Sequence, residues 1–163
     1  MNAITKEQSV RTLQIIVFAM ATGLAIFAGV AFSIGEQNTD NPPTMSYVAA
    51  VVAAGMFLAR FVIGPSVVAA QRRQIPREGW SGLDSAGRFS KLFPVLQTKT
   101  IVENAIVEAA GFLAGVAYLV EGQIWTLVIL AACAVIILMS VPTLGRIEEW
   151  IDDQTQIIES EMI

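Results

Sequence analysis

Two carboxylates and an amide lie in an apolar stretch of the sequence that is long enough to cross a membrane. Glu103, Asn104 and Glu108 belong to the run QTKTIVENAIVEAAGFLAGVAYLVEG, from Gln97 to Gly122. An ionisable side chain inside a bilayer is costly, so it is typically paired, protonated or exposed to an internal cavity. The chemistry that this pattern indicates is an ion pair, or the binding and release of a proton or an ion.

Arg60 is the one charged residue inside another apolar run, from about Tyr47 to Ala70. We estimate the depth of each charge by counting residues inward from the cytoplasmic end of its run. At ~1.5 Å per residue, Arg60 and Glu108 lie at depths of roughly 16 and 15 Å. We therefore predict an ion pair between Arg60 and Glu108, with Asn104, one turn away, donating a hydrogen bond to the Glu108 carboxylate. Such a pair serves either to fix the register of two helices, or to move an ion or proton or bind a ligand.

Glu103 points about 140° away from Glu108 at ~100° per residue. We expect Glu103 either to extend to the membrane interface or to pair with Lys99, one turn earlier. Gly111 and Gly115 form a GxxxG motif, which lets membrane helices approach closely. The same spacing of small residues recurs in the first apolar run, at Ala21, Ala25 and Gly29.

The composition places these residues in a membrane protein. The chain has 163 residues, of which 55% are hydrophobic and 15% charged, and its mean hydropathy is +0.63. This predicts an all-α, integral membrane four-helix bundle that forms one domain over residues 1–163. The expected spans are approximately 13–34, 47–70, 98–120 and 124–141. The tight turn at residues 121–123 makes the last two spans antiparallel neighbours.

The connection between the second and third spans, residues 71–98, is basic. Apolar residues repeat within it every three or four positions, which predicts either a short cytoplasmic helix in the membrane interface or an amphipathic connector packed on protein. In the first case Trp80, Arg88, Lys91 and Lys99, with Glu103, act as interfacial anchors. The C-terminal tail has an acidic amphipathic pattern, and we expect it to dock on this basic connection.

Basic residues are distributed very unevenly along the chain. Of ten Lys and Arg, nine lie in the N-terminus, the second connection and the C-terminal segment, and the tenth is Arg60. The positive-inside rule therefore predicts a multi-pass membrane protein with both termini and the second connection in the cytoplasm. The net charge of −4 argues against nucleic acid as a partner. The expected partners are the lipid bilayer and, in a homo-oligomer or a larger membrane complex, other membrane proteins.

The residue types needed for most enzyme chemistry are missing from the sequence. It has no histidine and a single cysteine, Cys133, inside an apolar run. It also has no P-loop, no GxGxxG after a strand, no HExxH and no GxSxG. We therefore expect no enzyme activity, no metal site and no cofactor.

The C-terminal half resembles a group of small, uncharacterised bacterial proteins with four predicted spans. The resemblance covers roughly residues 93–154. It rests on a Gln-Thr-Lys sequence where the third span begins, a glutamate in the middle of that span followed by small residues, and a Pro-Thr sequence where the fourth span ends. The matching residues are Gln97, Thr98, Lys99, Glu108, Gly111, Pro142 and Thr143. It implies a four-helix fold in a bacterial inner membrane and no particular activity.

Two functions remain open from the sequence. The first is a structural, scaffolding or accessory subunit of the membrane. The alternative is a small ion- or proton-handling component that uses Glu108, since paired hairpins with a midmembrane carboxylate resemble the proteolipid subunits of rotary ATPases. The chain departs from that pattern because its first span lacks their dense glycines and Arg60 is expected at the level of the carboxylate.

Overall fold

The protein is helical throughout the part of the chain that its computed structural model describes, residues 6–36, 42–75 and 80–161. Arg77 and most of the proline-rich first connection lie outside these residues, so the predictions that concern them are not tested. Within the described ranges there are five α-helices, one short 3₁₀ helix and no strand. The α-helices are α1 (Lys6–Ile34), α2 (Thr44–Arg72), α3 (Ser85–Glu121), α4 (Ile124–Met139) and α5 (Leu144–Ser160), and the 3₁₀ helix is η1 (Trp80–Gly82).

Three of these helices, α1, α2 and α3, are long and apolar enough to cross a membrane. A fourth span is obtained if α4 and α5, which are bent by 74° at their junction, are counted as one. The prediction of an all-α protein is thus confirmed for the described residues, and three to four of their helices are long and apolar enough to span a membrane. α4 has only 16 residues, which at ~1.5 Å per residue makes it about 24 Å long.

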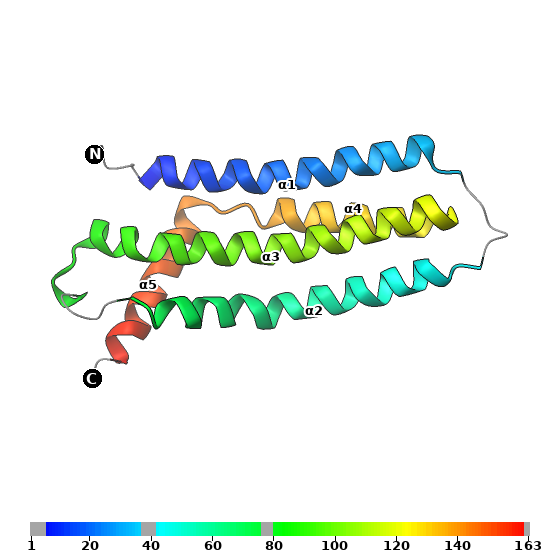
Figure 1. The fold of residues 1–163 in the computed structure, drawn as a ribbon. Helices are drawn as coiled ribbons and strands as arrows, with labels where there is room; N and C mark the ends of the chain where they lie inside the picture. The colour runs from blue at the N-terminus through cyan, green and yellow to red at the C-terminus, as the bar shows by residue number, and fades with distance from the viewer. Residues whose placement is uncertain (1–5, 37–41, 76–79, 162–163) are drawn as a thin grey trace.

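The long helices run side by side with alternating direction, and α5 crosses the end of the bundle near the N-terminus (Figure 1). α3 is the central element, because it packs against α1, α2, α4 and α5. The turn at Gly122 and Gln123 joins α3 to α4 as antiparallel neighbours, as predicted. Gly122 has φ 70°, and its N–H donates to the carbonyl of Tyr118 at 2.7 Å. This left-handed conformation favours glycine and ends α3 at Glu121.

α3 begins much earlier than the expected third span. Asp84 caps its first turn by accepting a hydrogen bond from Gly87 N at 2.8 Å, and the helix then continues for 37 residues through Pro94. The segment expected to form a separate interfacial helix is therefore the first part of α3. Proline in a helix costs one backbone hydrogen bond, and burial of the surrounding apolar side chains offsets this cost.

Those apolar side chains form a hydrophobic cluster with α1 and α5. The cluster includes Val10, Leu13, Trp80, Phe89, Leu92, Phe93, Leu96, Ile147, Ile151 and Ile158. Trp80 is 0% exposed, so it is a core residue of this cluster and not an anchor at the lipid headgroups. The structure thus supports the second sequence-based interpretation of this segment, an amphipathic stretch packed on protein.

Ion pairs attach the acidic tail to the basic end of the bundle. Arg72 Nη2 lies 2.7 Å from Glu161 Oε1, and Arg88 Nη2 lies 3.2 Å from Glu159 Oε1. Both arginines come from the connection on which we expected the tail to dock, so that prediction is confirmed. Arg88 accordingly contacts α5 and does not serve as a free interfacial anchor.

The GxxxG motif of α3 is used inside the bundle. A Cβ at Gly115 would overlap the ring of Phe27 and come within 2.7 Å of Leu130, and one at Gly111 would lie 3.0 Å from Leu24. These neighbours belong to α1 and α4, so this face is not available for contact with a second copy. The small residues of α1 differ from one another, because Ala21 is buried whereas Ala25 and Gly29 are exposed.

Gly115→Ala is expected to destabilise the bundle by about 1–3 kcal/mol, since overpacking a close helix contact forces neighbouring side chains out of place. Gly29→Ala is the matched control, because a Cβ there meets nothing within 4 Å, and the change should be neutral or stabilise the protein by up to about 1 kcal/mol. Thermal unfolding of the two purified variants in detergent measures the difference. Equal midpoints for both variants would contradict the packing described for α3.

Candidate functional site

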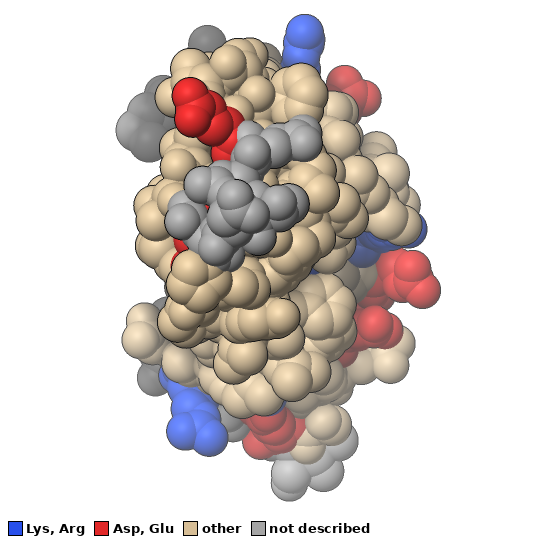
Figure 2. Space-filling model, turned by 90° about the vertical axis from the view of Figure 1, so that its right-hand side faces the viewer, with Lys and Arg blue, Asp and Glu red and all other residues tan. Residues whose placement is uncertain are grey.

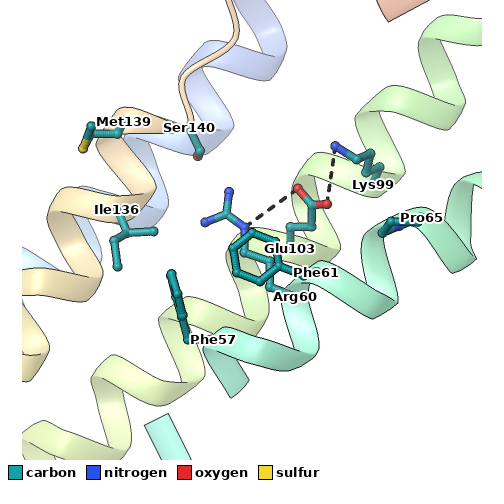
Figure 3. Close-up of a pocket in the computed structure, with 9 residues that line it drawn as sticks. All are labelled: Phe57, Arg60, Phe61, Pro65, Lys99, Glu103, Ile136, Met139 and Ser140. Carbon is teal, nitrogen blue, oxygen red and sulfur yellow. Dashed lines mark ion pairs between the residues drawn. The ribbon is translucent and has the colours of Figure 1, made fainter. Parts of the chain in front are cut away.

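A cluster of three charged side chains joins α2 to α3. Arg60 Nε lies 3.9 Å from Glu103 Oε2, and Lys99 Nζ lies 3.4 Å from Glu103 Oε1 (Figure 3). The three side chains are 14–27% exposed. The predicted pairing of Glu103 with Lys99 is confirmed, while its pairing with Arg60 was not anticipated.

Gly64 makes room for this cluster. Its position on α2 is one turn from Arg60, and a Cβ built there would overlap the Glu103 carboxylate. The absence of a side chain at Gly64 therefore lets Glu103 lie directly against α2, within reach of Arg60. Any larger residue would push the carboxylate away from α2.

The predicted pair between Arg60 and Glu108 does not form, because the two side chains face different helices. Glu108 is directed toward α1, where its Oε1 lies 3.8 Å from the position of a Cβ on Gly23. Counting residues places two side chains at a similar depth but leaves open their direction around the helix axis. Within the described ranges, Glu108 has no ion pair and no hydrogen bond.

Asn104 is completely buried, at 0% exposure. Its Oδ1 accepts a hydrogen bond from Ser140 Oγ at 2.8 Å, and its Nδ2 has no partner among the described residues. The expected hydrogen bond from Asn104 to Glu108 is therefore replaced by a link between α3 and the end of α4. Ser140 Oγ also lies 2.7 Å from the carbonyl of Ile137, so with the amide turned by 180° Nδ2 donates to Ser140 Oγ while Ser140 donates to Ile137.

The charged cluster lines a cleft between α2, α3 and α4. One part of the cleft, about 530 Å³, has apolar walls as well as Arg60, Lys99 and Glu103: Phe57, Phe61, Pro65, Ile136 and Met139. Ser140 completes this part, and Figure 3 shows these nine side chains around the open space. The other part, about 330 Å³, shares the charged residues and is also lined by Asn104, Arg146 and Trp150.

Glu121 is a polar residue whose role the sequence analysis missed. It is 7% exposed, and its carboxylate accepts hydrogen bonds from Met45 N at 2.5 Å, Ser46 N at 2.7 Å and Ser46 Oγ at 2.6 Å. These donors belong to the first turn of α2, whose preceding residue, Pro43, provides no side-chain cap. Glu121 thus satisfies free N–H groups of α2 from a different helix. The sequence signal that could have indicated this role is an acidic residue at the end of the third expected span, opposite the start of the second.

Lys91 is partly buried and lines a groove with Gln71, Gln74, Ile75 and Val95. The described part of the chain holds no group of three His, Cys, Asp or Glu side chains suited to a metal ion.

No protein-family model matches the chain, and neither a curated protein nor a solved structure matches it significantly. The resemblance described from the sequence therefore stays a prediction.

Glu103→Gln is expected to lower the free energy of unfolding by about 1–3 kcal/mol, between the values typical of exposed and of buried ion pairs. The cause is the loss of the carboxylate that balances Arg60 and Lys99. The same substitution five residues later, Glu108→Gln, removes no ion pair and should change stability by less than about 0.5 kcal/mol. Chemical denaturation in detergent compares the two variants. A larger loss of unfolding free energy for Glu108→Gln would contradict this structure and support the predicted pair of Arg60 and Glu108.

Proposed function

We propose that the protein is a non-catalytic, structural or accessory component of a bacterial inner membrane. The observation that carries this proposal is that its polar groups join helices to one another. Glu103 links α3 to α2, Glu121 links α3 to the start of α2, and Asn104 links α3 to the end of α4. Gln14 of α1 likewise donates to the carbonyl of Pro142 at 2.8 Å.

Links of this kind favour a rigid membrane unit. Interhelical hydrogen bonds and close contacts at small residues are the main forces that hold membrane helices together. Glu103, Glu121, Asn104 and Gln14 each serve such a contact. An accessory subunit, alone or in a larger membrane complex, needs this rigidity and no catalytic residue.

The proposed orientation places both termini in the cytoplasm. The described Lys and Arg residues other than Arg60 belong to the bundle end that carries the N-terminus and α5 (Figure 1). Seen from the opposite end, the described surface is mostly uncharged apart from an acidic side chain near the grey segment, and basic side chains are visible only around the margin (Figure 2). Tyr47 and Trp125 pack together near that opposite end, with ring centroids 5.9 Å apart. Basic residues on the cytoplasmic side and aromatic residues at an interface are the pattern of this topology.

The proposed topology is tested by cysteine labelling in a Cys133→Ala background. Glu36 and Ser160 are both exposed and lie at opposite ends of the bundle. Glu36→Cys should react with a membrane-impermeant maleimide on intact spheroplasts, whereas Ser160→Cys should react only after the membrane is opened. The reverse pattern would overturn the orientation, and the Cys133→Ala parent controls for background labelling.

A second candidate function is proton or ion handling, and one observation favours it. Glu108 is a carboxylate within a long apolar helix, and the described residues offer it neither an ion pair nor a hydrogen bond. An unpaired intramembrane carboxylate is a functional-site hypothesis by default.

Purified protein in proteoliposomes separates the two functions. The accessory role predicts that the wild type gives no proton, sodium or potassium flux above that of empty liposomes, whether or not a voltage is applied. A flux that Glu108→Gln abolishes, and that Glu7→Gln at the exposed start of α1 leaves intact, would establish the second function and exclude a purely accessory role.

A further inference from the structure

We propose that the cleft between α2, α3, α4 and the start of α5 binds an anionic phospholipid. The phosphate lies against Arg60, Lys99 and Arg146, and an acyl chain follows the apolar wall of the same cleft. This inference rests on the membrane placement proposed above, but it does not depend on the accessory role.

The charge of the cleft suits a phosphate. Its lining includes three basic residues, one each from α2, α3 and α5, and Glu103 as the acidic residue, which leaves a net charge of 3 − 1 = +2 when all four are ionised. Arg60 approaches Glu103 only through Nε, at 3.9 Å, which is too long for a hydrogen bond. The two terminal nitrogens of Arg60 point away from Glu103, toward the side of Ile136 and Ser140 (Figure 3). Such a planar pair of donors matches the geometry of a phosphate.

The opposite wall of the cleft suits a hydrocarbon chain. Phe57, Phe61 and Met139 line the outer part, and they are 41%, 65% and 74% exposed. Apolar walls with a few converging polar groups are typical of sites for amphipathic ligands. An acyl chain would cover these side chains while its headgroup remains at the charged end.

The level of the site also fits a headgroup. The hydrogen bond between Ser46 and Glu121 fixes a common level near the end of the bundle opposite the N-terminus. From there Glu103 and Gly64 each lie 18 residues along their helices, roughly 27 Å at ~1.5 Å per residue. The hydrocarbon core of a bilayer is about 30 Å thick, so Glu103 lies near the cytoplasmic boundary. Arg60 lies 14 residues from Ser46, roughly 21 Å along α2, which puts it about 9 Å inside that boundary, shallower than the roughly 16 Å expected from the sequence. Basic pockets between helices on that side are suited to anionic lipid headgroups.

The test measures lipid binding to the purified protein by native mass spectrometry, using phosphatidylglycerol, phosphatidylcholine and inorganic phosphate as probes. We expect phosphatidylglycerol to bind at least tenfold more tightly than phosphatidylcholine and to resist displacement by millimolar inorganic phosphate. Arg146→Gln should weaken phosphatidylglycerol binding about fivefold, the equivalent of about 1 kcal/mol for one basic residue near the membrane surface.

Arg73→Gln is the matched control, because Arg73 is exposed at the same end of the bundle but does not line the cleft. Arg73→Gln should leave the affinity unchanged. Arg146 is exposed and makes no ion pair among the described residues, so its substitution tests binding without breaking a helix contact. Equal affinities for the two lipids, or equal losses in the two variants, would overturn the proposal. Displacement by inorganic phosphate would show a site for the free anion and not for a lipid.

Discussion

The contact of the Glu103 carboxylate with α2 is the interaction on which the arrangement of this bundle depends. α2 packs mainly on α3, and two polar contacts hold it there. At one end Glu121 binds the first turn of α2; at the other Glu103 lies over Gly64 between Arg60 and Lys99. Two contacts so far apart along one pair of helices fix both the register and the rotation of α2, which apolar contacts in lipid would specify only weakly.

Much of the fold could be predicted from the sequence because it depends on local properties. The lengths of the apolar runs predicted helices that could span a membrane, and residues 121–123 predicted the turn between α3 and α4. The spacing of Lys99 and Glu103 was sufficient to predict their ion pair, because residues four apart share one face of a helix. The acidic tail and the basic connection were matched by charge alone, and Arg72 and Arg88 do pair with the tail, at Glu161 and Glu159.

The features that could not be predicted depend on how helices are rotated relative to one another. Arg60 was assigned to the wrong carboxylate because a count of residues gives depth and not direction. The small size of Gly64 admits the Glu103 carboxylate against α2, one turn from Arg60. Trp80 was misplaced for a similar reason: amphipathic patterns indicate an apolar face without showing whether lipid or protein covers it. Here α1 and α5 cover it.

The cleft follows from the unequal lengths of the helices. α3 has 37 residues and α4 only 16, so α4 ends beside the middle of α3, where a longer partner would have covered Glu103 and Arg60. The chain then turns by 74° into α5, whose first turns bring Arg146 and Trp150 over the opening. A short fourth helix therefore leaves the charged cluster accessible from the side of the bundle, at the level where the sharp turn adds a further cation. If α4 were one turn longer, its side chains would fill the space beside Arg60. The short length of α4, which makes it marginal as a membrane span, therefore creates the site.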